Sequence, residues 1–203
     1  MVEHYYSENP VSGHDIKRIK FAFKGYALEF ITDAGVFSKG KVDTGSGILL
    51  NALPDRLSGK VLDMGCGYGA IGVSIAKAYP DVEVVMVDIN NRAVELAQEN
   101  IKLNGVDNAI AYQSDGFAQV DGLFDIIVSN PPIRAGKSVV YAIFEQCAMH
   151  LKSGGEFYVV IQKKQGAESA MAKLAEIYGN CEKVARDGGY WVLGCVNGYG
   201  NRG

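Results

Sequence analysis

The chain has 203 residues, of which 48% are hydrophobic and 21% charged, and its net charge is −3. This composition is typical of one globular α/β domain, and the charge argues against an indiscriminate nucleic-acid binder, because affinity for phosphates comes mainly from Lys and Arg. The four cysteines and three histidines form no C-x-x-C pair or ligand cluster, and no apolar run is long enough to cross a membrane. We therefore expect no disulfide framework, no metal site, no signal peptide and a cytoplasmic location.

Residues 1–59 differ in pattern from the rest of the chain. The apolar runs 21–32 and 36–37 predict a small hairpin that turns at 33–35, and residues 46–53 predict a short helix that ends before Pro54. We expect this extension to cover the ligand-binding edge of a core domain that spans residues 60–196. The tail 197–203 is predicted to be frayed.

In the core, short apolar runs alternate with helical patterns. Amphipathic helices are predicted around Ala93 to Ile101 and Ala167 to Tyr178, because apolar residues recur there at helical spacing. Strands are predicted over residues 60–64, 82–87, 109–113, 124–129, 156–161, 182–185 and 190–196. The alternation predicts a Rossmann-like α/β fold, with a mostly parallel seven-stranded sheet and helices on both faces. Only residues 186–189 join the last two strands, so the last strand should be antiparallel.

A glycine-rich loop follows the first core strand. Gly65, Cys66, Gly67 and Gly69 precede an apolar helix that begins near Ala70, and glycines there let a ligand approach backbone N–H groups at the helix N-terminus. Asp88 lies 23 residues beyond Gly65, where a nicotinamide enzyme would hold its ribose. Loop and acid predict an adenosine-containing ligand without choosing between cofactors.

Acids follow three consecutive strands, at Asp63, Asp88 and Asp115. Parallel strands bring such residues to one edge of the sheet, although each acid alone is also typical of a helix cap or turn. A carboxylate beside a pyrophosphate would repel it, whereas S-adenosylmethionine carries a sulfonium and an ammonium that a carboxylate attracts. Asp63 therefore favours S-adenosylmethionine over a nicotinamide dinucleotide.

The most informative motif is Asn130-Pro131-Pro132-Ile133, after the fourth core strand. Two prolines remove two N–H donors and stiffen the backbone, so the Asn130 side chain and the Pro131 carbonyl are predicted to be fixed acceptors. An exocyclic amine offers two hydrogens to such a pair, which would direct its lone pair at a methyl donor. Catalysis would then depend on positioning and electrostatics. The alternative interpretation is a plain strand-ending turn.

These motifs, in this order and at this spacing across residues 60–196, resemble those of class I S-adenosylmethionine-dependent methyltransferases. The resemblance implies that the glycine loop packs on the methionine part, that Asp88 accepts the ribose hydroxyls and that Asp115 reaches the adenine amine. Asn130 and Pro131 are the predicted catalytic residues. The predicted cofactor-binding residues are Asp63, Gly65, Cys66, Gly67, Asp88, Ile89, Asp115, Gly116 and Asn130.

Residues 35–38, 43–50 and 130–137 further resemble the RsmC type of ribosomal RNA guanine-N2 methyltransferases. This implies guanine N2 as the target, ribosomal RNA or the small ribosomal subunit as the partner, and a short single-domain form without the second methyltransferase-like domain. Alternatives are a protein-glutamine or adenine-N6 methyltransferase, a nicotinamide oxidoreductase and a cofactor-binding module without catalysis.

Substrate contacts are predicted at Phe37, Ile133, Arg134 and Lys137. Many relatives have an aromatic residue where this chain has Ile133, so Phe37 is the alternative candidate for stacking on the base. Two groups of cations, which are either phosphate contacts or merely solvated, are Lys17, Arg18, Lys20 and Lys24, and Arg134, Lys137, Lys163 and Lys164.

Overall fold

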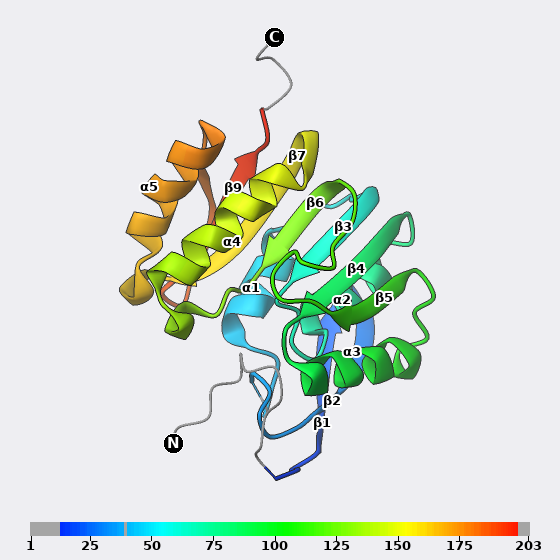
Figure 1. Cartoon of the computed structure of the whole chain (residues 1–203). Helices are drawn as coiled ribbons and strands as arrows, with labels where there is room; N and C mark the ends of the chain where they lie inside the picture. Colours follow the sequence, from blue (N-terminus) through cyan, green and yellow to red (C-terminus); the bar gives the residue numbers. More distant parts are fainter. Residues whose placement is uncertain (1–12, 39, 199–203) are drawn as a thin grey trace.

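A computed structural model describes residues 13–38 and 40–198. The central sheet contains β3 (Gly59–Met64), β4 (Val82–Asp88), β5 (Ala109–Gln113), β6 (Phe124–Ser129), β7 (Leu151–Gln162), β8 (Glu182–Asp187) and β9 (Tyr190–Val196). Their order is β5-β4-β3-β6-β7-β9-β8 (Figure 1). Strands β3 to β7 are parallel, whereas β9 is antiparallel to β7 and β8. The predicted fold class is confirmed.

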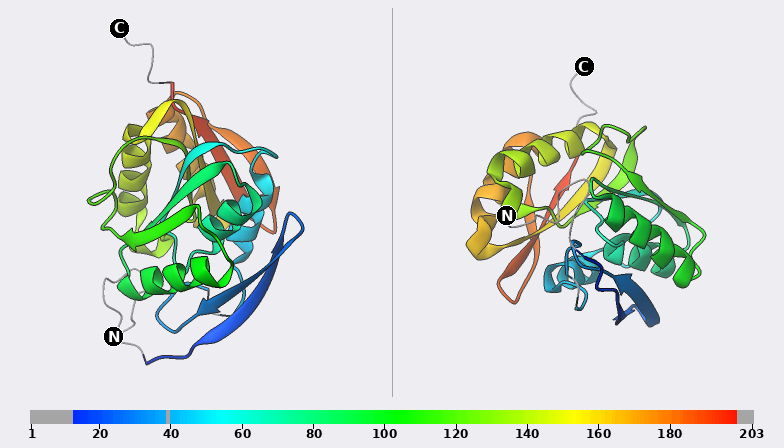
Figure 2. Two further views of the ribbon diagram at one scale, coloured as in Figure 1. Left: turned by 90° about the vertical axis from the view of Figure 1, so that its right-hand side faces the viewer. Right: turned by 60° about the horizontal axis from the view of Figure 1, so that its bottom comes forward.

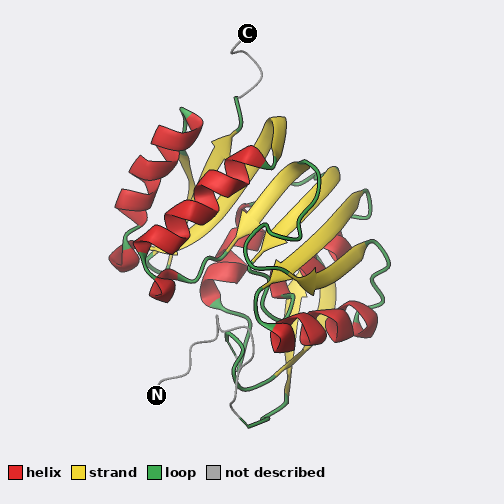
Figure 3. Cartoon of the chain, viewed as in Figure 1, coloured by secondary structure: helices red, strands yellow, loops and turns green. Residues whose placement is uncertain are grey.

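Helices cover both faces of this sheet, which explains why its central strands are apolar on both sides. One face carries α1 (Thr44–Ala52), α2 (Ala70–Ala78) and α3 (Asn91–Leu103), and the other carries α4 (Lys137–Met149) and α5 (Ala167–Tyr178) (Figure 3). A separate buried apolar cluster fills each of the two layers. Short 3-10 turns, η1 (Ile133–Ala135) and η2 (Lys163–Gln165), precede α4 and α5.

The N-terminal hairpin lies earlier in the chain than predicted. Strand β1 (Lys17–Phe23) pairs with β2 (Tyr26–Thr32) around Lys24 and Gly25, whose φ angles are 45° and 83°. A two-residue hairpin turn of type I′ has such left-handed backbone at both central residues, which a lysine rarely adopts, so the sequence does not mark a turn here. Residues 34–35 do form a turn, but it leads from β2 into the loop before α1, so the prediction that the hairpin turns at 33–35 is wrong. Residues 36–37 lie in that loop.

The hairpin lies beside α3 (Figure 2), and two asparagines, one in α3 and one that caps its C-terminal end, hold it there. Asn100 Oδ1 accepts from the Ile31 N–H at 2.7 Å, and Asn100 Nδ2 donates to the Ile31 carbonyl at 2.9 Å. Asn104 makes the same pair of bonds with the backbone of Glu29, at 3.1 and 2.8 Å. The side-chain amides therefore satisfy backbone groups along the edge of β2 that β1 does not occupy.

The C-terminal end of the described chain is anchored at Asn197, which is 3% exposed. Its backbone N–H donates to the Gly155 carbonyl at 2.8 Å, and its side chain donates to the Leu151 carbonyl at 2.9 Å. The prediction of fraying is therefore wrong at this residue, because its backbone and side-chain bonds fix it against β7. The rest of the predicted tail, 199–203, lies outside the described residues.

All four cysteines are free thiols. Among the described helices, none has the length and apolarity needed to cross a bilayer. The described residues likewise contain no group of three His, Cys, Asp or Glu side chains arranged to hold a metal ion.

Candidate active site

A cavity of about 590 Å³ lies at the carboxyl ends of β3, β4, β5 and β6. From β3 the strands β4 and β5 are added on one side, and β6 and β7 on the other, so the strand order reverses between β3 and β6. Open α/β sheets bind ligands at such a switch point. The volume suits a nucleoside-sized ligand. The lining residues are 36–38, 43 and 46 around the start of α1, 64–68, 70 and 71 around the glycine loop, 88, 89, 93 and 114–116 after β4 and β5, and 130, 132, 135, 139, 142, 143 and 146 after β6 and in α4.

The glycine loop presents bare backbone to this cavity. Gly65 and Gly67 have φ angles of 73° and 56°, a region that side chains disfavour, and a Cβ on either would meet no protein atom within 4 Å. The N–H groups of Gly65 and Cys66 both donate to the Val87 carbonyl at 2.9 Å, which fixes the loop across the end of β4. The loop therefore leaves space for a ligand, while its backbone conformation disfavours any residue with a side chain at these two positions.

Asp88, at the end of β4, is held by backbone on both sides. Its Oδ2 accepts from the Gly67 N–H at 2.8 Å and its Oδ1 from the Asn90 N–H at 2.9 Å. Burial raises the pKa of Asp88, and the two N–H bonds oppose that rise. Each oxygen keeps a second lone pair, so the carboxylate can still accept hydroxyl groups from a ligand in the cavity.

The turn after β5 lies beside Asp88. The Ser114 N–H donates to the Asp88 carbonyl at 3.0 Å, and the Ser114 hydroxyl donates to the Gly116 carbonyl at 2.8 Å. Asp115 itself is exposed and lines the cavity, as do Ile89 and Gly116. Predicted cofactor residues from two loops are thus brought together at one end of the cavity.

Asp63 is placed differently from the other predicted cofactor residues. It is fully buried, it does not line the cavity, and its Oδ2 accepts from the Gly72 N–H of α2 at 2.8 Å. Its Oδ1 has no hydrogen-bond partner among the described residues, and burial raises the pKa of Asp63 to about 7. The carboxylate therefore supports α2 from behind the loop. Its attraction for the cofactor, which would act without direct contact, stays a prediction.

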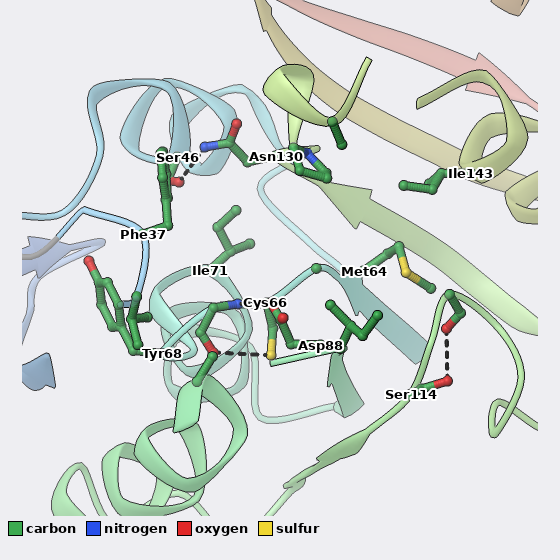
Figure 4. A pocket seen from close by; sticks show the side chains of 18 of the residues that line it. Phe37, Ser46, Met64, Cys66, Tyr68, Ile71, Asp88, Ser114, Asn130 and Ile143 are labelled. Carbon is green, nitrogen blue, oxygen red and sulfur yellow. Dashed lines mark hydrogen bonds between the residues drawn. The ribbon is translucent and has the colours of Figure 1, made fainter. Parts of the chain in front are cut away.

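Asn130 is fixed at the end of β6. The hydroxyl of the preceding Ser129 donates to the Met64 carbonyl at 2.8 Å and ties β6 to β3. Both hydrogens of the Asn130 amide are used, because Nδ2 donates to Asp43 Oδ2 at 2.9 Å and to Ser46 Oγ at 3.0 Å. Figure 4 shows the bond to Ser46. Within the described residues, Oδ1 is left as an acceptor in the cavity lining.

Four other predicted residues around this motif lie outside the lining. The Pro131 carbonyl accepts from the Ile133 N–H at 2.8 Å, which leaves it one lone pair. Ile133 packs against the buried cluster under α4, so it does not take the place of a stacking aromatic. Arg134 and Lys137 are exposed and lie close in sequence to the lining residues Ala135 and Val139.

Phe37 is half-buried and lines the same cavity. In Figure 4 it lies near Ser46 and Asn130, at the end of the cavity away from Ser114. The cavity thus has an acceptor and an aromatic face at one end, and the glycine loop, Asp88 and the 114–116 turn at the other.

Sequence reasoning assigned no role to Asp43, Ser46 or the α4 residues of the lining. Asp43 caps α1, since its Oδ2 accepts from the Ser46 N–H at 3.1 Å, and Asp is one of the residues that mark a helix start in a sequence. The lining residues Val139, Ala142, Ile143 and Gln146 lie on a helix that was not predicted.

This fold and site are those of a class I methyltransferase. The chain belongs to the methyltransferase small domain family, whose model matches residues 27–194. Its cofactor is S-adenosylmethionine, as predicted, and the bare glycine loop and Asp88 fit that ligand.

The chain is similar to two individual relatives over most of its own length. The chain is 47% identical over 196 residues to the uncharacterized protein YbxB of Bacillus subtilis (strain 168), covering 95% of this chain and 98% of that protein. It is 38% identical over 167 residues to ribosomal RNA small subunit methyltransferase C of Haemophilus influenzae (strain 86-028NP), covering 80% of this chain and 49% of that protein. The predicted resemblance to the RsmC type is confirmed.

Among solved structures, the chain resembles the T. thermophilus 16S rRNA N2 G1207 methyltransferase (RsmC) in complex with AdoMet and guanosine. The TM-score is 0.81 at 30% identity, over 93% of this chain and 52% of that chain. The chain thus spans about half the length of the RsmC proteins that it matches.

Proposed function

We propose that the protein methylates the N2 amine of a guanine in small-subunit ribosomal RNA. The observation that carries this proposal is the Asn130 amide, which lines one cavity with the glycine loop and Asp88 and has both of its hydrogens engaged. A fixed oxygen acceptor is what an amine donor requires. The RsmC relatives, including the one solved with AdoMet and guanosine, support guanine as the base.

In the proposed reaction Asn130 Oδ1 accepts one hydrogen of the target amine, and the free lone pair of the Pro131 carbonyl is the candidate acceptor for the other. Both bonds favour a nitrogen whose lone pair is no longer delocalised into the ring. When bound, S-adenosylmethionine supplies an electrophilic methyl group: the N–C bond forms as the S–C bond breaks, S-adenosylhomocysteine leaves and the amine proton passes to solvent. The chain's own contribution is positioning and electrostatics.

Access to the cavity supports an unpaired target. A base within an RNA helix cannot reach a recessed pocket, so the nucleotide must lie in a loop or be turned out of the stack. Phe37 is the candidate aromatic surface for the extruded base, and the exposed Arg134 and Lys137 are candidate contacts for the flanking phosphates.

The test compares ribosomal RNA from cells with and without this protein by mass-spectrometric mapping of modified nucleosides. We expect loss of one N2-methylguanosine in small-subunit RNA, and its return when the purified protein and S-adenosylmethionine are added to the deficient RNA or subunit. In parallel, adenine-containing RNA and a glutamine peptide are offered as acceptors. Transfer only to the peptide, or loss of a methyladenosine instead, would replace the guanine proposal.

A further inference from the structure

We infer that Asp43 and Ser46 are positioning residues that fix the Asn130 amide with its oxygen toward the methyl-accepting amine. This inference rests on the proposed function, because it explains how the proposed acceptor is aimed. The two residues begin α1, 87 and 84 positions before Asn130, and all three line the cavity.

The hydrogen-bond pattern allows one orientation of the amide. Asp43 Oδ2 lies 2.9 Å from Asn130 Nδ2, and a carboxylate oxygen only accepts hydrogen bonds. Turning the amide over would bring Asn130 Oδ1 to that position and set two oxygen lone pairs against each other. The Ser46 hydroxyl, 3.0 Å away, takes the second hydrogen. Without these partners the Asn130 amide could turn its NH2 group toward the target amine, and an NH2 group cannot accept the hydrogens of the amine.

The two partners are themselves held by packed structure. The Ser46 N–H donates to the same Asp43 oxygen at 3.1 Å, and Ser46 is 5% exposed on a helix whose Leu49 and Leu50 are fully buried. A Cβ on Gly45 would lie 2.9 Å from Asp43 Oδ2 and 3.0 Å from Tyr190 Cε1, so β9 closes the space behind the carboxylate. The position of the Asn130 oxygen is therefore set by the packing of α1 against the sheet.

The charge on Asp43 adds an electronic contribution. Hydrogen bonds to an ionised acceptor are stronger than neutral ones, and a bond at one end of an amide polarises the group toward its other end. Asp43 therefore increases the negative charge on Asn130 Oδ1, which strengthens its bond to an amine that becomes positive as it is methylated. This effect requires no contact between Asp43 and the substrate.

The experiment uses Ser46→Ala and Asp43→Asn. Ser46→Ala removes one partner of Asn130 and keeps the backbone bond of the cap. Asp43→Asn keeps a capping oxygen but removes the charge, because Asn caps helices about as well as Asp. Ser74→Ala is the matched control: Ser74 is a fully buried helix serine, its hydroxyl donates to the Ala70 carbonyl at 2.6 Å, and it does not line the cavity.

The first readout is the side-chain ¹⁵N–¹H NMR signal pair of Asn130, assigned by its loss in Asn130→Ala. Ser46→Ala and Asp43→Asn should shift this pair and speed its exchange with solvent, whereas Ser74→Ala should not. The second readout is single-turnover methyl transfer to guanine-containing RNA. Loss of one such hydrogen bond should slow transfer about tenfold, with affinity for S-adenosylhomocysteine changed less than twofold.

A double-mutant cycle distinguishes positioning from general damage. If Ser46 acts through Asn130, Ser46→Ala should have no further effect on the rate in an Asn130→Ala background. Additive rate losses, or an unshifted Asn130 signal pair in Ser46→Ala, would overturn the inference. Failure of the wild type to methylate guanine RNA would instead overturn the proposed function, and the NMR comparison would still test the orientation of the amide.

Discussion

The side-chain amide of Asn100 donates to the Tyr68 carbonyl at 2.8 Å and so joins α3 to the glycine loop. The same fully buried amide also bonds both backbone groups of Ile31 in the N-terminal hairpin. One side chain therefore connects the glycine loop to the N-terminal hairpin. A substitution of Asn100 should affect both the loop and the hairpin.

Replacing Asn100 with Ala should lower the free energy of unfolding by about 2 to 4 kcal/mol, because several buried backbone groups lose their partners. It should also weaken S-adenosylhomocysteine binding, since the Tyr68 turn is released. Asn104→Ala is the matched control, because Asn104 bonds Glu29 of the hairpin and makes no bond to the loop. Denaturant unfolding and calorimetry measure the two effects. Equal losses of affinity in both variants would contradict the coupling.

Asp88→Ala should weaken S-adenosylhomocysteine binding at least tenfold, because it removes hydrogen bonds to a charged acceptor. Asp88→Asn should also lose affinity, since its amide nitrogen cannot accept from Gly67 or Asn90, which Asp88 serves with separate oxygens. Asp115→Asn, at an exposed residue, should have the smaller effect. Unchanged affinity in a folded Asp88→Ala would reject its role in cofactor binding.

Asn130→Ala should reduce the methyl-transfer rate by about 10² to 10³ and leave cofactor affinity largely intact, as expected for one preorganised polar group. Asn130→Asp should bind cofactor at least as well as wild type yet turn over more slowly, because its added charge stabilises the cationic ground state. The substitution Asn130→Asp also removes the two amide hydrogens that Asp43 and Ser46 accept, and it places a second carboxylate beside Asp43. Full single-turnover activity in Asn130→Ala would eliminate the amine-positioning mechanism.

Asp63 should make stability depend on pH between about 4 and 7. Its pKa is raised from 3.8 to about 7 in the folded chain, so unfolding releases a proton in this window and stability falls as pH rises. Asp63→Asn cannot ionise, so the variant's free energy of unfolding minus that of the wild type should rise across the window by up to about 4 kcal/mol. Urea unfolding at a series of pH values measures this difference. A difference that is constant from pH 4.5 to 8 would contradict it.

Arg134 and Lys137 should contribute to the salt dependence of RNA methylation. Replacing either cation with Ala should reduce the log-log slope of affinity against salt by about one unit if that side chain neutralises a phosphate. Lys17 and Lys20 are tested in the same way, because Arg18 and Lys24 already contact Glu29 and Asp55. Lys102→Ala, in the last turn of α3, is the control. Slopes unchanged in all of these variants would assign the cations to a solvated surface.

Local patterns in the sequence were sufficient to predict the sheet and its cofactor loop. The strand β5, for example, was predicted over its observed range, 109–113, because the run of strand-forming residues and the turn residues around it are local. The longer β7 begins at Leu151, five residues before its predicted start, because its first part pairs with Phe124 across a register shift. That pairing depends on a neighbouring strand and leaves no mark in the local pattern.

Short stretches of the chain predict which residues can turn, accept hydrogen bonds and bind a ligand: glycines before a helix, Asp88 after a strand, and an amide stiffened by prolines. These properties follow from backbone sterics and side-chain chemistry within a few residues. The burial of Asp63 behind the loop and the bond from Asn130 to Asp43, 87 residues away, follow instead from how the elements pack. The order of the strands and the seating of α1 on the sheet bring such residues together, and neither is encoded in the spacing of a motif.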